Sequence, residues 1–298
     1  MKYIYFKWKI SNFGDDLNGW LWPKLFGDIA NNELFFLGIG TILFKDFPLI
    51  KSLPPKSKKI VFGSGYRPTD NSLLIDNTWD FRFLRGPLSS LYLENRHKYI
   101  SDAAYCVRHT KEFDSIANTK KEYEISFMPY FRSIDGIDWV KICEELGFHY
   151  ISPFTENGVD FTLNEIAKSK LLITEAMHGA IVADLLRVPW HRLVLSTPHT
   201  EGAMVSEFKW NDWLFSVNIF NSEKTKIECL RKTKLNPIIK GVSAGIMETE
   251  FLLTYKIKKD LLTILPRIKD FYLSDDKVLS QLDEMLNDEI HLLKKDYQ

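Results

Sequence analysis

The residues best suited to chemistry in this sequence lie where an apolar strand pattern passes into an apolar helix pattern. The stretch LLITEAMHGAIVADLLRVPW, residues 171–190, places Glu175 and His178 at that seam. We expect Thr174 to cap the helix, so that both side chains lie in its first turn and on one side. Free N–H groups and the helix dipole attract an anion there. The seam therefore predicts an anion site with a proton donor or acceptor beside it.

The same seam also has a purely structural interpretation. His178 could be a core histidine bonded to a carbonyl group, with Glu175 facing solvent. Gly179 follows His178 and, having no side chain, lets a ligand or another backbone segment approach closely. Because ligands of open α/β sheets gather at the carboxyl ends of strands, the functional interpretation places an anion next to Thr174 and Gly179.

A second polar loop, SNFGDDLNGW, follows the first apolar segment of the chain. Asn12 and Gly14 are expected to form a tight turn that exposes Asp15 and Asp16 towards a cleft. Asn12 and Gly14 would then contact an acceptor substrate bound in that cleft. One of the two carboxylates would then serve as a base or accept a hydrogen bond from a hydroxyl group of the ligand. Adjacent aspartates before a helix are also ordinary capping residues, so this alternative stays open.

Two glycine pairs, in GIGT and GSGY, invite a nucleotide-binding interpretation. Neither stretch completes GxGxxG with an acidic residue about 20 positions later. We expect these loops to form the floor of a cleft, with Ser64 and Tyr66 as acceptor contacts. The sequence has neither a P-loop nor a GxSxG elbow. No grouping of His, Cys or carboxylate residues has the spacing of a metal site, so no metal and no cofactor are expected.

The elements that must position these residues alternate between strands and helices, which predicts an α/β fold with parallel sheets. We expect an N-terminal α/β lobe over residues 1–115 and a second α/β lobe over 122–235, joined by a polar linker. Residues 236–298 lose the alternation and have helical periodicity. They predict a helical segment that packs on the lobes.

Composition excludes several function classes. Lys plus Arg and Asp plus Glu number 39 each among 298 residues, so no overall field attracts nucleic acid. Cys106, Cys143 and Cys229 form no CxxC pair, as expected in a reducing compartment. The most continuous apolar run, residues 34–44, is shorter than the ~20 residues of a membrane helix. We expect a cytoplasmic protein, with peripheral contact at the inner face of the membrane left open.

Four stretches together resemble the polysaccharide pyruvyltransferases: NFGDDLN, RGPLS, SDAAYCVR and ITEAMHGAIVADLLRVPW, in this order along the chain. The last is most similar to the exopolysaccharide ketal-pyruvyltransferase branch. The resemblance implies two Rossmann-like lobes in a GT-B-like arrangement. It also implies transfer of the pyruvyl group of phosphoenolpyruvate onto a sugar as a ketal, with release of phosphate.

This resemblance also implies roles for individual residues. His178 would contact the donor phosphate or protonate the leaving group, and Glu175 would accept a hydroxyl proton or orient His178. Many family members carry an arginine two places before the histidine, where this chain has Ala176. The donor anions therefore need cations from elsewhere, and Arg132 and Arg85 are the candidates because a guanidinium fork fits both phosphate and carboxylate.

Two other functions fit the same sequence. One is a GT-B glycosyltransferase that uses a nucleotide sugar, since a fold does not settle a function. The other is a non-catalytic carbohydrate-binding relative. The sequence leaves open the acceptor sugar and its linkage, the ketal stereochemistry, whether the acceptor is lipid-linked, and the oligomeric state.

Overall fold

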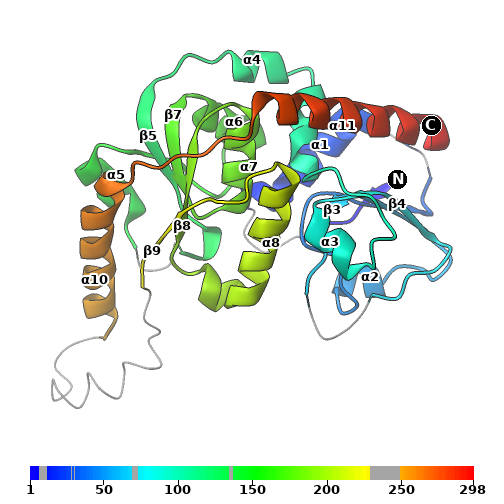
Figure 1. Cartoon of the computed structure of the whole chain (residues 1–298), viewed down its shortest axis with the longest axis horizontal. Helices are drawn as coiled ribbons and strands as arrows, with labels where there is room; N and C mark the ends of the chain where they lie inside the picture. Colours follow the sequence, from blue (N-terminus) through cyan, green and yellow to red (C-terminus); the bar gives the residue numbers. More distant parts are fainter. Residues whose placement is uncertain (7–11, 28, 30, 69–72, 134–136, 229–248) are drawn as a thin grey trace.

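The computed structural model describes residues 1–6, 12–27, 29, 31–68, 73–133, 137–228 and 249–298, with the backbone alone for 249–254. It contains two parallel β-sheets with helices packed around them (Figure 1). The first sheet has the order β1-β2-β3-β4, with β1 at Lys2–Tyr3, β2 at Leu34–Leu37, β3 at Lys58–Ser64 and β4 at Trp79–Leu84. The second has the order β6-β5-β7-β8-β9, with β5 at Tyr123–Met128, β6 at His149–Tyr150, β7 at Ser169–Thr174, β8 at Trp190–Val194 and β9 at Lys224–Lys226. The predicted α/β class is confirmed.

The helices connect and cover the strands. The α-helices are α1 Phe13–Phe26, α2 Pro48–Lys51, α3 Pro87–Tyr92, α4 Phe113–Ala117, α5 Trp139–Leu146, α6 Val159–Ala167, α7 Met177–Leu185, α8 Ala203–Ser216, α10 Thr249–Ile264 and α11 Asp276–Tyr297. Short turns of 3₁₀-helix are η1 Ala103–His109, η2 Phe131–Ser133 and η4 Leu265–Arg267, and η3 Pro198–Gly202 is a π-helical turn. Each strand pair is parallel, as the alternating pattern of the sequence predicts.

Helix α1 ties the two sheets together. Trp22 packs against Phe36 of the first sheet with ring centroids 4.9 Å apart, while the helix also contacts α6 and α7 of the second half. The Asn18 side chain accepts from the backbone N–H of Ile39 at 2.9 Å and donates to its carbonyl oxygen at 3.0 Å. A buried amide with both groups satisfied fixes α1 against the loop after β2. One hydrophobic core runs from the first sheet through α1 to α7 and α11.

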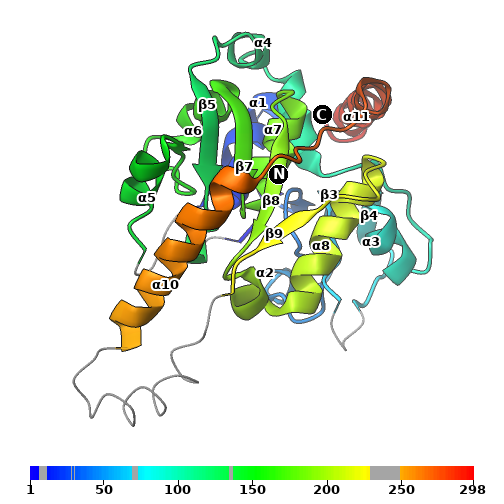
Figure 2. The ribbon, with the colours of Figure 1, turned by 60° about the vertical axis from the view of Figure 1, so that its left-hand side comes forward.

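The C-terminal helices pack on opposite halves of the molecule. Helix α10 lies against α5, where Lys258 Nζ is 2.7 Å from Glu145 Oε1 (Figure 2). Helix α11 returns to the first sheet, where Arg82 Nη2 lies 2.6 Å from Asp296 Oδ2 (Figure 1). The predicted start of this segment, residue 236, falls outside the described residues.

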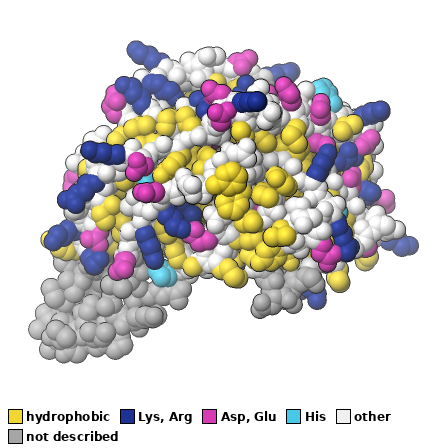
Figure 3. All heavy atoms as spheres, viewed as in Figure 1, with side chains coloured by type: hydrophobic (Ala, Val, Ile, Leu, Met, Phe, Trp, Pro, Cys, Tyr) yellow, Lys and Arg dark blue, Asp and Glu magenta, His cyan; other side chains and the backbone are white. Residues whose placement is uncertain are grey.

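The surface in Figure 3 carries both signs of charge interspersed with apolar side chains. Within the described ranges, we find no helix with the length and apolar character that a membrane crossing requires. Cys106 and Cys143 are buried free thiols. Cys229 lies outside the described residues.

Candidate active site

A cavity of about 380 Å³ is lined by segments that follow strands of both sheets. From the first half come residues 40–48 after β2 and Arg85 after β4; from the second come residues 128–132 after β5 and 176–178 after β7. The carboxyl ends of both parallel sheets therefore face one hollow, the position at which open α/β sheets bind ligands. The N-terminal turn of α1 completes the wall.

The strand-to-helix seam differs from its prediction. Helix α7 begins at Met177, and its N-cap residue, Ala176, makes no side-chain cap. The prediction that Thr174 caps the helix is wrong, because its hydroxyl donates to the carbonyl of Met128 at 2.9 Å and accepts from the Ala176 N–H at 3.0 Å. Thr174 is fully buried, and it holds β7 to β5 rather than facing the cavity.

Glu175 lies on the far side of the seam from the cavity. Its Oε1 accepts from the backbone N–H groups of Leu195, Ser196 and Thr197 at 2.9, 2.7 and 2.9 Å, and its Oε2 accepts from the Ser133 hydroxyl. The prediction that Glu175 shares a helical face with His178 is wrong, because Glu175 precedes the helix and orders the loop after β8. Its lone pairs are already used, so its position gives no support to an acid–base role.

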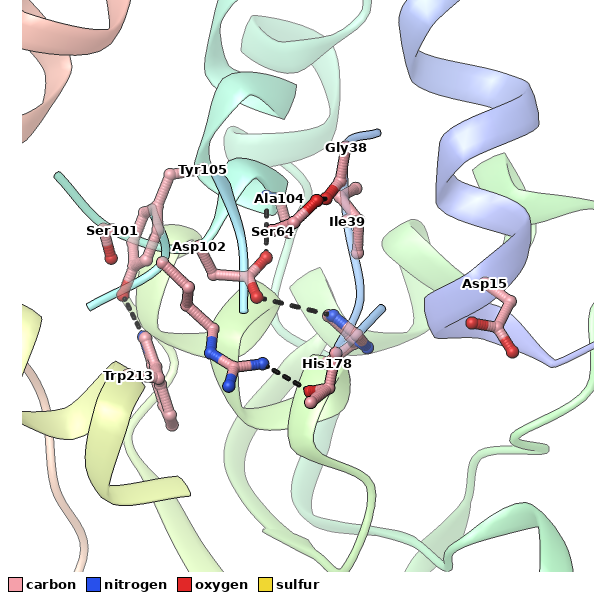
Figure 4. Close-up of polar contacts among 12 residues, drawn as sticks. Asp15, Gly38, Ile39, Ser64, Ser101, Asp102, Ala104, Tyr105, His178 and Trp213 are labelled. Carbon is pink, nitrogen blue, oxygen red and sulfur yellow. Dashed lines mark hydrogen bonds and ion pairs between the residues drawn. The ribbon is translucent and has the colours of Figure 1, made fainter. Parts of the chain in front are cut away.

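His178, in the first turn of α7, lies between Asp102 and Asp15 (Figure 4). Its Nε2 atom is 3.7 Å from Oδ2 of Asp102, a carboxylate that is fully buried at the start of η1. On the other side of the ring, a Cβ atom at Gly14 would come within 2.1 Å of Nδ1. The lack of a side chain at Gly14 therefore gives the imidazole its place against α1.

Asp15 brings a second titratable group to the cavity wall. Burial raises the pKa of its carboxyl, while a hydrogen bond from Asn12 and the proximity of His178 and Lys209 act in the opposite direction. The side-chain amide of Asn12 donates to Oδ2 of Asp15 at 2.6 Å, and its Oδ1 accepts from the Asp15 backbone N–H at 3.2 Å as the cap of α1. Asn12 and Gly14 thus hold the aspartate at the cavity, although the predicted tight turn is the first turn of a helix.

Asp15→Asn is expected to raise the melting temperature at pH 7 to 8. The pKa of Asp15 is raised in the folded state, so the folded protein loses stability as pH rises through that value and the carboxyl ionises. An amide carries no charge to bury, so the gain over wild type should shrink as pH falls and wild-type Asp15 becomes neutral.

Thermal unfolding of both proteins across pH 4 to 8 measures this difference. Asp16→Asn is the matched control, because Asp16 accepts from the Thr155 hydroxyl outside the cavity. An Asp15→Asn difference from wild type that is constant with pH would contradict the argument.

Arg85 extends into the cavity from the end of β4 and is 1% exposed. Its Nε donates to Asp212 Oδ2 at 3.0 Å and its Nη1 to the Thr41 hydroxyl at 2.7 Å. Its Nη2 is buried and has no hydrogen-bond partner among the described residues. A buried, unpaired donor on a cation is costly. The guanidinium that carries it lines the cavity, where an anion would be bound through charge-assisted hydrogen bonds.

The cavity lining carries two further cations, Lys209 and Arg132. Lys209 of α8 pairs with Glu201 at 2.6 Å, and the Arg132 guanidinium lies over the Phe131 ring and donates to the Thr200 carbonyl at 3.2 Å. Burial alone would raise the pKa of Glu201, but Lys209, Tyr130 and Arg132 outweigh it and lower the pKa. Arg132 is exposed at the cavity, so an anionic ligand can reach its guanidinium from solvent.

Four other predicted site residues lie outside the cavity lining. Ser64 is fully buried and donates to the Leu37 and Gly38 carbonyls; Tyr66 packs its ring on Tyr92. Gly179 provides packing space, since a Cβ there would approach Met128 Sδ to 2.7 Å. Of the two glycine loops expected at the cleft floor, the GIGT loop lines the cavity through Gly40 and Thr41, whereas Ser64 and Tyr66 of the GSGY loop do not. Asp16, bonded to Thr155, is likewise outside the lining.

Comparison with known proteins shows a sequence similarity to a protein of polysaccharide biosynthesis. The chain is 35% identical over 223 residues to succinoglycan biosynthesis protein ExoV of Rhizobium meliloti (strain 1021). This chain is similar to a succinoglycan biosynthesis protein. The aligned residues cover 74% of the chain and 66% of ExoV, so the match spans just under two thirds of that protein's length. No protein-family model matches the chain.

The structure places residues at the cavity, or beside His178, that the sequence did not indicate as site residues. Asp102 lies within SDAAYCVR, but nothing in its spacing indicates that it would meet His178, 76 positions away. Lys209 and Glu201 lie on α8 and η3, where charged residues are ordinary surface residues in the sequence. Only the tertiary fold places them at the cavity.

Proposed function

We propose that this chain transfers the pyruvyl group of phosphoenolpyruvate onto a sugar of an exopolysaccharide, or of its precursor, as a ketal. The observation that carries the proposal is the convergence of Asp15, His178 and Arg85 on the lining of one cavity. The similarity to a succinoglycan biosynthesis protein supports a saccharide acceptor. The four motifs of the sequence support the donor.

The proposed architecture is GT-B-like. We assign lobes to residues 1–115 and 122–235, with 236–298 as the helical segment that packs on them. Two parallel sheets whose carboxyl ends face one cavity support this assignment. A cytoplasmic location, where phosphoenolpyruvate is available, belongs to the same proposal.

The donor carries two anionic groups, a phosphate and a carboxylate. Arg85, Arg132 and Lys209 all line the cavity, and Nη2 of Arg85 has no hydrogen-bond partner among the described residues. Guanidinium groups bind such anions through paired hydrogen bonds and fix their orientation. Three cations in the lining would bind the phosphate and the carboxylate at separate positions, with C2 of the enol between them.

The proposed reaction has two additions. Protonation of the methylene carbon C3 makes C2 electrophilic, and the first sugar hydroxyl adds to C2 as it loses its proton. The bond from C2 to the phosphate oxygen then breaks, phosphate leaves with the electron pair, and the second hydroxyl adds to C2 with loss of its proton. Of the two protons released, one replaces the proton used at C3 and the other leaves with phosphate. The site thus needs a proton donor and a proton acceptor.

Asp15 and His178 fit these two tasks. A raised pKa favours the protonated carboxyl, so Asp15 is the proposed donor to C3. The imidazole of His178 is the proposed acceptor of the hydroxyl proton, since an unprotonated imidazole is a base near neutral pH. Two titratable groups in different environments can therefore divide acid and base work.

Gly14→Ala is expected to lower turnover on the order of 10²-fold while the protein stays folded. The added Cβ would stand 2.1 Å from His178 Nδ1, so the imidazole must move. Gly19→Ala is the matched control in α1, because its Cβ would meet only the Tyr5 hydroxyl, at 2.8 Å, the end of a movable side chain. Steady-state kinetics of both variants test the effect, and similar turnover in the two would contradict it.

Thermal unfolding with ligands separates this function from its alternatives. Phosphoenolpyruvate at 100 times its dissociation constant should stabilise the protein by about 2.7 kcal/mol, whereas uridine or guanosine diphosphate should not. A glycosyltransferase that uses a nucleotide sugar would respond to the nucleotide, and stabilisation by the nucleotide alone would overturn the proposal. A non-catalytic carbohydrate-binding relative would respond to neither.

A further inference from the structure

Two buried polar atoms face each other in the centre of the molecule without a hydrogen bond. Oδ2 of Asp102 and Nε2 of His178 each have no hydrogen-bond partner among the described residues, and they lie 3.7 Å apart (Figure 4). Leaving such atoms unsatisfied costs about 1–3 kcal/mol each. A small rotation of the imidazole would bring them to hydrogen-bond distance, so each is the natural partner of the other.

The fold fixes both members of this pair. Asp102 is the N-cap of η1, and its Oδ1 accepts from the Ala104 N–H at 3.0 Å, which leaves only Oδ2 free for the imidazole. Gly63 has φ of +80°, and a Cβ there would be 2.9 Å from the Ala103 backbone nitrogen. Glycine at this position of β3 therefore allows the start of η1 to approach closely.

The charges around the pair favour an ionised Asp102. Burial would raise the pKa of its carboxyl, but His178, Arg85 and the Ala104 amide outweigh burial and lower the pKa. From α1, Asp15 also faces His178, and Lys209 lies near Asp15. A carboxylate that stays ionised can only accept a hydrogen bond, so the atom facing it must be a donor.

We infer that Asp102 is a positioning residue that holds the Nε2 proton of His178, so that Nδ1 is the atom that exchanges protons with the substrate. A neutral imidazole has one N–H, and a carboxylate at Nε2 therefore leaves the lone pair on Nδ1. Nδ1 lies next to Gly14, which has no side chain, and both Gly14 and Asp15 line the cavity. That Nδ1 exchanges protons with a substrate rests on the proposed function. That the neutral ring carries its proton on Nε2 follows from Asp102 and does not depend on the proposed function.

The tautomer can be measured without turnover. In ¹⁵N-labelled wild-type protein, the chemical shifts of His178, assigned by their loss in His178→Ala, should show the neutral ring protonated at Nε2. In Asp102→Asn the amide can still accept from Ala104 through its oxygen while its NH₂ group faces Nε2. The neutral ring should therefore switch to the Nδ1–H form. Asp283→Asn is the matched control, because Asp283 lies 3.1 Å from Nε2 of His109, outside the cavity.

Turnover provides the second readout. Asp102→Asn should lower kcat on the order of 10²-fold or more, with a small change in KM for phosphoenolpyruvate, because the imidazole lacks its base at Nδ1. Asp283→Asn should leave both constants near wild type. The inference is overturned if wild-type His178 carries its neutral proton on Nδ1, or if Asp102→Asn changes neither the tautomer nor kcat. The expected tautomer in a protein that forms no ketal would sustain the inference and refute the proposed function.

Discussion

His178→Ala is expected to lower kcat for pyruvyl transfer on the order of 10²-fold or more, the contribution of one acid–base group. The imidazole stands between Asp102 and Asp15 at the cavity, and within the lining no other histidine is present to replace it. The fold should survive, because the ring is 18% exposed and makes no hydrogen bond through Nε2. Steady-state kinetics and circular dichroism measure the two effects.

His149→Ala is the matched control for this variant. His149 also pairs with a carboxylate, Glu165, but it lies outside the cavity. Its loss should leave kcat within a few fold of wild type. Near-wild-type turnover in His178→Ala would remove the imidazole from the mechanism.

Arg85→Ala is expected to lower the free energy of unfolding by about 3–5 kcal/mol, because it leaves Asp212 buried without its cation. Loss of activity in this variant would therefore not separate binding from folding. Arg85→Lys keeps the charge but loses the fork, so it should fold better and still bind phosphoenolpyruvate at least ~10-fold more weakly, a change of about 1.4 kcal/mol. Chemical denaturation and titration calorimetry measure the two quantities.

Two other arginines provide comparisons for Arg85. Arg82 is also paired with carboxylates, Asp80 and Asp296, but outside the cavity, so Arg82→Lys should not change donor affinity. Arg132 is exposed at the cavity, so Arg132→Ala should weaken donor binding while stability stays within about 0.5 kcal/mol of wild type. Unchanged donor affinity in Arg85→Lys would show that Nη2 does not contact the donor.

Much of the fold could be predicted from the sequence because its local signals agree with its tertiary structure. Apolar runs such as KKIVF and LLIT form strands β3 and β7, and Pro189 follows the end of α7 as a helix breaker. The polar loops after these runs mark the carboxyl ends of strands. This local context, together with the family resemblance, is why His178, Arg85, Arg132 and Asp15 could be expected at one site, and all four line the cavity.

The failures concern residues whose role depends on a partner distant in sequence. Glu175 has the same local context as His178, yet its carboxylate binds three backbone N–H groups of the loop after β8, about 20 residues later. Asp102 has no local signal for a role, yet the chain brings it to His178. Periodicity identifies faces and ends of elements, but it carries no information about which side chains meet across two sheets.

The most direct test of the central claim is a mass measurement of the acceptor. The purified protein is incubated with phosphoenolpyruvate and oligosaccharides from exopolysaccharide, and inorganic phosphate is measured in the same sample. Pyruvyl transfer as a ketal predicts one phosphate released for each pyruvyl group gained by the sugar, with neither change in His178→Ala. A sugar that gains mass only when a nucleotide sugar is supplied, with no phosphate released from phosphoenolpyruvate, would contradict the account.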